Sequence, residues 1–303
     1  MADDIPFRKD MNFEYGVPNV LYPGVTRIVA NNPGPFTFKG TNTYLLGEGR
    51  DVALVDPGPE DDAHFDAIMR ALDGRRIGSI LITHTHRDHI DGLPRLKSAT
   101  GATVYGYGRK AREPGKVTKS ASGGESNDED FVPDVVMTDG SRFEGEGYAL
   151  TALFTPGHAP DHLCFAIEGT GLLLSGDHVM GWNTSVVAPP EGNMAAYMRS
   201  LDSLMQRDDT VFLPGHGERI EQPRRVVKAF IMHRRMREQA ILDCIRNGST
   251  SIAEIVATVY RGLDPRLVRA ASLSIAAHVE ELVERGLVTA SGSAAQPENL
   301  SPV

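Results

Sequence analysis

The sequence is poor in cysteine and has no long apolar run. Only two cysteines occur in 303 residues, Cys164 and Cys244, and each lies in an apolar pattern. We therefore expect both to be core residues and neither to form a disulfide or bind a metal. No stretch approaches the roughly 18 apolar residues that a membrane-spanning helix needs. Residues 1–6 have no apolar core, which argues against a secretory signal. These absences predict a cytoplasmic protein with no membrane partner.

The chain also lacks the excess of positive charge that is typical of a nonspecific nucleic-acid binder. Its 31 Lys and Arg stand against 40 Asp and Glu, so the net charge is −9. Residues 224–286 differ, with 11 basic and 7 acidic side chains, a surplus of +4 that leaves −13 for the remainder. We interpret this basic surplus as solvated helix faces in preference to a binding patch.

The sequence does contain a dense cluster of possible metal ligands after a predicted strand. The apolar run Ile80-Leu81-Ile82 is followed closely by His84, His86, Asp88 and His89. In an extended segment, His84 and His86 point to the same side, while Asp88 and His89 follow the turn and can face a second ion. Imidazole and carboxylate ligands suit zinc, iron or manganese. The alternative is a polar loop with scattered histidines.

Three more ligand-type residues lie downstream, each after an apolar run and next to a glycine. His158 follows the run 150–154, Asp177 follows 172–174, and His216 follows 211–213. Loops at strand ends are where a rigid sheet can hold chemical groups. Each residue alone would be an ordinary loop residue, but together with the first cluster they predict a site for two metals.

The whole pattern, HxHxDH followed by a single His, a single Asp and a final His, resembles the metallo-β-lactamase fold. The resemblance implies an α/β protein, an αββα sandwich of two sheets with helices outside. It implies two divalent ions, zinc or alternatively iron or manganese, that share a bridging hydroxide as the nucleophile. Asp88 would orient this nucleophile or accept its proton as a catalytic residue. The implied ligands are His84, His86 and His158 for one ion, Asp88, His89 and His216 for the other, and Asp177 as the bridge.

The resemblance extends over roughly residues 20–290. The segments 32–37, 40–45, 55–58 and 230–238 are similar to those of the β-lactamase-like hydrolases that carry a C-terminal winged helix. Because the animal mitochondrial members of that subgroup are single-strand-specific endoribonucleases, the similarity implies a phosphodiester in single-stranded RNA as substrate. Asp177 argues against antibiotic hydrolysis, since the true β-lactamases of this fold usually lack the bridging carboxylate.

A second substrate class is a thioester or lactone of a small acyl compound. The same metals serve it, and the acidic catalytic part favours it slightly over a polyanion. A third possibility is a nonenzymatic binding protein that has lost its metals, which the full ligand set disfavours. The oligomeric state is left open.

The apolar patterns divide the chain into parts. We expect a catalytic domain over residues 1–222, with strands at 25–30, 43–47, 51–55 and 77–82 and a helix at 61–72. Within it, residues 109–134 contain few apolar side chains and predict a flexible insertion, either unstructured or a lid over the substrate. Residues 291–303 are predicted to be a disordered tail.

Residues 223–290 predict a small winged-helix-like domain. A long helix ends at Gly248, Ser251 and Glu254 form a capping box, and Asp264-Pro265 opens a helix that ends near Gly286. Such a unit either presents a recognition helix to nucleic acid or buttresses the catalytic domain. We favour the buttress, because acidic residues gather near the end of the last helix.

Four residues are candidates for substrate contacts. His233 and Arg237 lie four residues apart on the long helix and thus on one face, where they would clamp a phosphate or carboxylate or form an ordinary surface or interdomain contact. Thr41 and Asn42 follow a glycine turn. They would donate hydrogen bonds to substrate or cap a hairpin.

Overall fold

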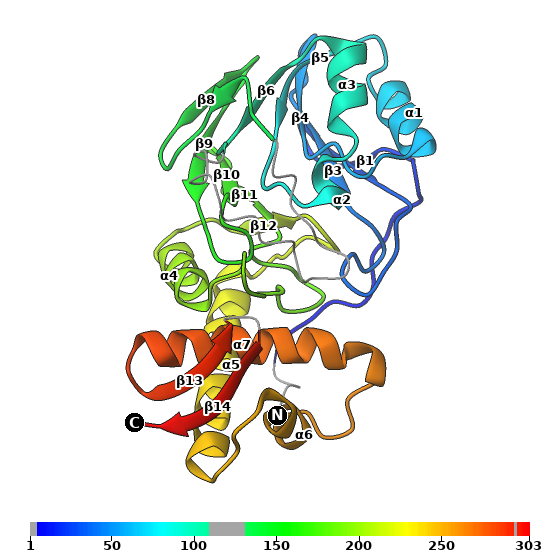
Figure 1. The fold of residues 1–303 in the computed structure, drawn as a ribbon. Helices are drawn as coiled ribbons and strands as arrows, with labels where there is room; N and C mark the ends of the chain where they lie inside the picture. The colour runs from blue at the N-terminus through cyan, green and yellow to red at the C-terminus, as the bar shows by residue number, and fades with distance from the viewer. Residues whose placement is uncertain (1–4, 109–130, 294–295) are drawn as a thin grey trace.

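Two β-sheets packed face to face form the upper part of the molecule in Figure 1, and helices with a hairpin form the lower part. The structure is a computed structural model that describes residues 5–108, 131–293 and 296–303. Most of the predicted insertion at 109–134 therefore lies outside the described residues. Of its last four residues, Phe131 is buried beside Ile82 in the core of the first sheet.

The first sheet carries its strands in chain order. Strands β1 to β4 run antiparallel and β4 to β7 run parallel. Its outer face is covered by α1 (Asp62–Ala71) and α3 (Leu93–Thr100), as Figure 1 shows. The strands are β1 (Asn19–Tyr22), β2 (Val25–Val29), β3 (Asn42–Leu46), β4 (Asp51–Val55), β5 (Arg76–Leu81), β6 (Thr103–Gly106) and β7 (Val135–Val136).

The second sheet has the order β12-β11-β10-β9-β8 and is antiparallel except for the parallel pair β11 and β12. Helix α4 (Met194–Met205) and the first half of α5 (Pro223–Arg246) cover its outer face. The strands are β8 (Arg142–Gly145), β9 (Tyr148–Phe154), β10 (Leu163–Ile167), β11 (Leu172–Gly176) and β12 (Val211–Pro214).

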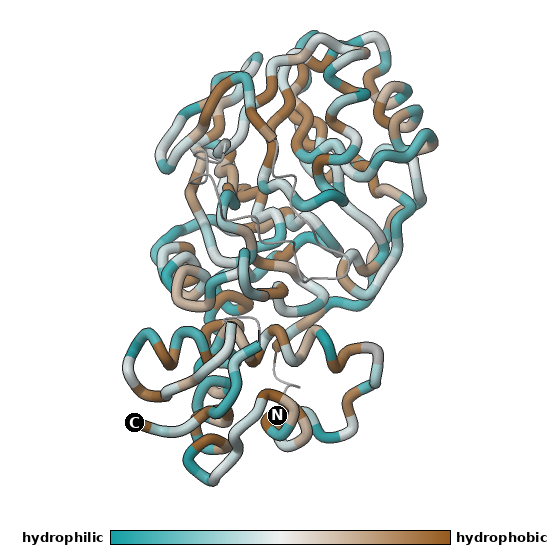
Figure 2. The backbone as a smooth tube through the Cα atoms, in the orientation of Figure 1, coloured by the Kyte–Doolittle hydropathy of each residue, from teal (hydrophilic) through white to brown (hydrophobic). Residues whose placement is uncertain are grey.

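The core lies between the two sheets. Side chains such as Tyr44 and Leu46 from one sheet meet Leu150, Phe165 and Leu213 from the other, each at most 2% exposed. Burial of this apolar surface stabilises the sandwich by roughly 25 cal/mol per Å². Figure 2 shows the apolar segments concentrated on the strands of both sheets. The αββα sandwich predicted from the sequence is confirmed.

The C-terminal unit is built on α5, α6 (Ile252–Val259) and α7 (Val268–Glu284), with a short 3-10 turn at Pro265–Leu267 before α7. The predicted capping box begins α6: Oγ of Ser251 accepts from N of Glu254, and Oε2 of Glu254 accepts from N of Thr250 at 2.7 Å. No described helix is both long and apolar enough to span a membrane.

The prediction of a disordered tail over 291–303 is wrong for its described residues. Strand β14 (Gln296–Pro302) pairs antiparallel with β13 (Val288–Ser293) as a hairpin. Leu300 is 2% exposed in the core of the C-terminal unit, and its N–H donates to O of Thr250 at 3.0 Å. The mostly polar sequence of this strand has no alternating pattern, yet the burial of Pro297 and Leu300 and the pairing with β13 order the segment.

Helix α5 belongs to both parts. In its first half, Val226 and Phe230 pack into the core under the second sheet. In its second half, Ile241 and Ile245 pack into the core of the C-terminal unit. The helix begins at Pro223, as predicted. Its first half lies in the predicted C-terminal domain but packs against the catalytic part.

Candidate metal centre

Seven ligand-type side chains converge where strands of both sheets end. All lie after β5, β9, β11 or β12, and Asp88 and His89 are on the short helix α2 (Arg87–Ile90) that follows β5. Six of them are at most 4% exposed, whereas the Asp88 side chain is 20% exposed. These are the residues that the sequence predicted: His84, His86, Asp88, His89, His158, Asp177 and His216.

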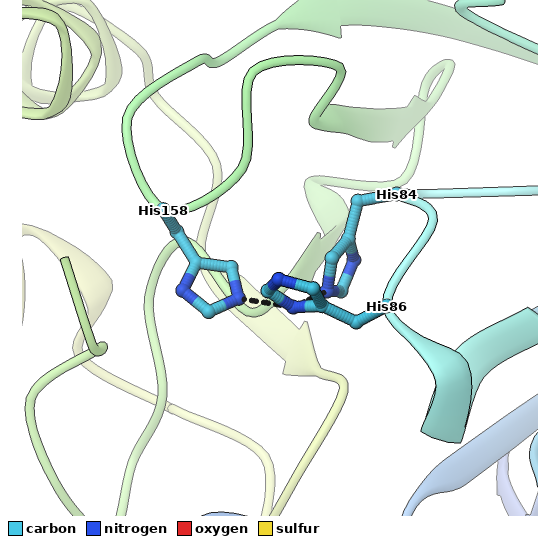
Figure 3. A group of neighbouring side chains, drawn as sticks. All are labelled: His84, His86 and His158. Atoms are coloured by element: carbon cyan, nitrogen blue, oxygen red, sulfur yellow. Dashed lines mark hydrogen bonds between the residues drawn. The ribbon is translucent and has the colours of Figure 1, made fainter. Parts of the chain in front are cut away.

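The first cluster consists of three imidazoles. Nδ1 of His86 lies 2.9 Å from Nε2 of His84 and 3.0 Å from Nε2 of His158. Figure 3 shows the three rings pointing toward one another, with His84 and His86 on one loop and His158 on another. Two nitrogen ligands of one tetrahedral ion lie about 3.4 Å apart. The cluster therefore has nearly the spacing that a shared ion needs.

The second cluster combines one carboxylate with two imidazoles. Oδ2 of Asp88 lies 3.1 Å from Nε2 of His216 and 3.4 Å from Nε2 of His89. The two Nε2 atoms are 3.3 Å apart. This is a second set of three donors with the spacing of metal ligands.

Asp177 stands between the clusters. Its Oδ2 lies 3.2 Å from Nε2 of His216 and 3.8 Å from Nε2 of His158, while its Oδ1 lies 3.5 Å from Nε2 of His89. Oδ1 is buried and has no hydrogen-bond partner among the residues that the structure describes. A buried, unpartnered carboxylate oxygen costs free energy unless something binds it, and a metal ion would do so.

Four of the histidines turn their other ring nitrogen to a partner outside the clusters. These pairs are His84 Nδ1 with Thr83 Oγ1 (2.9 Å), His89 Nδ1 with Asp56 Oδ2 (2.9 Å), His158 Nδ1 with Val186 O (2.6 Å) and His216 Nδ1 with Gly40 O (3.2 Å). An outer acceptor holds the proton on Nδ1 and leaves the Nε2 lone pair facing the cluster, which is the usual support of a metal-binding histidine. The donor set thus fits two metal ions.

The electrostatics favour the same conclusion. Burial, reinforced by neighbouring imidazoles, lowers the pKa of His84 and His86 well below 6.5, which keeps them in the neutral form that binds metals. Burial alone would raise the pKa of Asp177, but His216 and His89 hold it well below its usual range. Although burial opposes it, Asp177 and Asp88 raise the pKa of His216 to about 10. The carboxylates attract positive charge to this point, and two cations would supply it.

Thr41 and Asn42 are fully buried at the rim of this site. Oγ1 of Thr41 donates to Oδ2 of Asp88 at 3.2 Å and accepts from Nδ2 of Asn32. Nδ2 of Asn42 donates at 2.9 Å to the carbonyl oxygens of Pro214 and Gly217, on either side of His216. Both residues therefore support the metal loops, and a contact with substrate stays a prediction for them.

His233 and Arg237 lie on α5 and are half-buried. They line a groove of about 1000 Å³ between α5 and α6, where the guanidinium of Arg237 lies 4.0 Å from the centre of the Tyr260 ring. Burial, together with the charges of Arg234 and Arg237, lowers the pKa of His233 to about 4. His233 is therefore neutral near pH 7 and would not attract an anion by charge. The substrate clamp stays a prediction.

The role of Asp56 in supporting this site was not predicted from the sequence. This residue follows β4 directly, and its carboxylate accepts from N and Oγ1 of Thr83 at 2.8 and 2.7 Å as well as contacting His89. Its position after an apolar run is the signal that identified the metal ligands. The same criterion would have identified Asp56.

Comparisons with known proteins agree with this geometry. Residues 36–216 match the sequence profile of the "Metallo-beta-lactamase superfamily", and residues 251–296 match the "Beta-lactamase associated winged helix domain". The chain is similar to the "Beta-lactamase-like protein 2 homolog" of Drosophila melanogaster, with 32% identity over 90% of this chain and 92% of that protein. It is similar to the "Atrochrysone carboxyl ACP thioesterase" of Aspergillus fumigatus, with 30% identity over 80% of this chain and 75% of that protein.

Two solved structures share the fold. A metallo-beta-lactamase family protein from Thermus thermophilus superposes with a TM-score of 0.75 at 25% identity, covering 92% of this chain and all of that chain. A beta-lactamase domain protein from Burkholderia ambifaria gives a TM-score of 0.78 at 20% identity, covering 100% of this chain and 98% of that chain. The second likeness concerns the whole chain and therefore includes the C-terminal unit.

Proposed function

Because this chain belongs to the metallo-β-lactamase superfamily and its site has the donors of a two-metal hydrolase, we propose that it hydrolyses thioesters of acyl substrates. The observation that carries the choice of substrate is its similarity to a thioesterase that acts on an acyl carrier protein, at 30% identity over 262 residues. We propose zinc for both ions, since zinc prefers histidine and carboxylate ligands. Iron and manganese remain the alternatives for the same donors.

The charge of the chain supports a small acyl substrate. The net charge of −9 gives no general attraction for a polyanion. Single-stranded RNA remains the second candidate, favoured by the surplus of +4 over residues 224–286. Lactones would present the same kind of carbonyl centre as thioesters.

The side chains of the site have distinct roles in the hydrolysis of a thioester. The two bound ions would polarise the scissile carbonyl and acidify the attacking water. Asp177 neutralises charge between the two clusters. Asp88 is the ligand-type residue that solvent reaches most easily, with 20% of its side chain exposed, so we infer that substrate approaches from its side. Its carboxylate can orient the attacking water or accept its proton.

The proposal is tested by offering metal-loaded protein two substrates separately, an S-acyl N-acetylcysteamine thioester and an end-labelled single-stranded RNA. We expect release of free thiol and intact RNA. The His84→Ala variant should release no thiol, whereas His64→Gln, which alters a buried histidine outside the clusters, should behave like the parent.

Two results would contradict the proposal. RNA cleavage without thiol release would replace it by the ribonuclease activity. Activity on neither substrate, with two ions bound per chain, would reject thioesters and single-stranded RNA and leave lactones as the next acyl substrates to assay.

A further inference from the structure

Arg234 joins the C-terminal unit to the catalytic part through a buried guanidinium. It lies in the middle of α5 and is 4% exposed. Its Nη1 donates to Oγ of Ser274 on α7 at 3.3 Å, and its Nη2 donates to the carbonyl oxygen of Ser185 in the segment after β11. One side chain thus fixes a helix of the C-terminal unit and a loop of the catalytic part at the same time.

The loop that Arg234 holds supports two metal ligands. The carbonyl oxygen of Val186, the residue after Ser185, lies 2.6 Å from Nδ1 of His158. Oγ of Ser185 donates to the carbonyl oxygen of His178 at 2.9 Å, and His178 is the residue after Asp177. A shift of the Ser185–Val186 peptide would therefore move the acceptor that orients His158 and loosen the backbone beside Asp177.

Arg234 also contacts the loops of His158 and Asp177 indirectly, through Tyr197. Its guanidinium carbon lies 5.4 Å from the centre of the Tyr197 ring, and the Tyr197 hydroxyl also donates to the carbonyl oxygen of His178, at 2.9 Å. Tyr197 packs against Gly157, the residue before His158. Gly157 has φ +140°, and a Cβ there would lie 2.3 Å from Cα of Tyr197. The loops of His158 and Asp177 both rest on Tyr197, which lies beside the guanidinium.

If the residue at position 234 only held the two parts of the molecule together, it would not need to be an arginine. Burying a guanidinium carries a large desolvation cost, and well-packed apolar residues often serve an interface as well or better. Nε of Arg234 is buried and has no hydrogen-bond partner within the described part of the chain, which adds to the cost. The fork of the guanidinium does provide two fixed donors at a defined angle, and these reach Ser185 and Ser274.

We propose that Arg234 is a positioning residue of the metal centre. It fixes the Ser185–Val186 peptide so that Val186 O keeps His158 in the orientation and tautomer that present Nε2 to the first cluster. The C-terminal unit thereby sets the geometry of a metal site to which it contributes no ligand. This proposal rests on the two-metal site and not on the choice of substrate, and its readout is metal affinity, so failure of the thioester assay leaves it standing.

The test compares Arg234→Met with Arg235→Met, which changes the neighbouring exposed arginine of the same helix. Stepwise Zn²⁺ binding is measured on the full chain by competition with a chelator, and the spectrum of the Co²⁺-loaded protein reports the ligand geometry. We expect Arg234→Met to bind one of the two ions about 10- to 100-fold more weakly, the usual effect of removing support from a metal ligand. Arg235→Met should match the parent in both measurements.

Thermal unfolding of the metal-free proteins separates positioning from simple stability. If Arg234→Met unfolds at a lower temperature but binds both ions like the parent, with an unchanged Co²⁺ spectrum, the residue is only a structural tie and the proposal fails. Should this variant not fold, Arg234→Lys replaces it, because lysine lacks the fork that joins Ser185 to Ser274. We expect affinity for one ion to be roughly three- to tenfold weaker, and parent-like affinity would overturn the proposal.

Discussion

Oδ2 of Asp56 lies 2.9 Å from Nδ1 of His89, and both side chains are buried. Asp56 adopts φ +54°, a backbone conformation that costs free energy in a residue other than glycine. The fold retains it at the point where a carboxylate can hold both a metal-binding histidine and the first residue of the metal loop, Thr83.

Replacing Asp56 by alanine should therefore weaken metal binding at the second cluster by about 10- to 100-fold. It should also lower the free energy of unfolding by about 2–4 kcal/mol, because the N–H of Thr83 and Nδ1 of His89 lose their acceptor. Chelator competition and denaturant unfolding measure the two effects. Parent-like affinity would show that Asp56 does not orient His89 toward an ion.

Asp177→Asn keeps the shape of the side chain and removes its charge. Because the carboxylate stands between the two clusters, we expect fewer than two ions per chain and a fall in kcat of at least about 100-fold, or nearly 3 kcal/mol. Metal analysis of the purified variant and a kinetic assay at saturating metal check this. Two tightly held ions and normal turnover would reject the bridging role.

Thr41→Val removes the hydroxyl that donates to Asp88 and leaves the other contacts of Asp88 in place. We expect kcat to fall by about tenfold, or 1.4 kcal/mol, while both ions remain bound. Thr41→Ser restores the hydroxyl and serves as the control. If Thr41→Ser loses as much activity as Thr41→Val, the hydrogen bond to Asp88 is not the cause.

His64 should make stability depend on pH. Burial lowers its pKa from 6.5 to about 4, with a small opposing effect of Asp61. Between these values the unfolded chain binds a proton that the folded chain does not, so stability is full above pH 6.5 and falls as the pH drops toward 4, on the order of 3 kcal/mol for this group.

His64→Gln retains a donor for Oγ1 of Thr43, which contacts Nε2 of His64 at 2.9 Å, and removes the titration. The free energy of unfolding of the metal-free variant should therefore fall less than that of the parent between about pH 7 and about pH 4.5. Denaturant unfolding at both pH values gives the comparison. Equal losses in the two proteins would mean that His64 contributes nothing to the acid sensitivity.

The seven residues of the candidate metal centre could be predicted because each is a histidine or aspartate in a segment that follows a strand. Asp88 and His89 share one short segment, and the apolar runs before His158, Asp177 and His216 defined the strands that carry them. The supports of the site were harder to find. Val186 acts through its backbone carbonyl, which any residue could supply, and so its side chain gives no signal.

Contacts between segments that are distant in the sequence explain the remaining differences between the predicted and the observed structure. Arg234 lies on a helix that the sequence predicts, but its partner is a carbonyl oxygen in a loop 49 positions away. Strand β14 has no alternating pattern, since it is ordered by pairing with β13 and by burial of Pro297 and Leu300. Sequence periodicity reports which face of an element is buried, and it carries no record of such partners.

Helix α5 joins the catalytic part and the C-terminal unit into one structural unit. Because its two halves fill two different cores, neither part can be exchanged by recombination at its boundary without leaving an unfilled apolar surface in the other. In a hydrogen-exchange experiment, the amides of Phe230 and Ile245 should then become exposed in the same opening event. We therefore expect the winged helix to evolve together with the catalytic domain, because a continuous helix and not a flexible linker connects them.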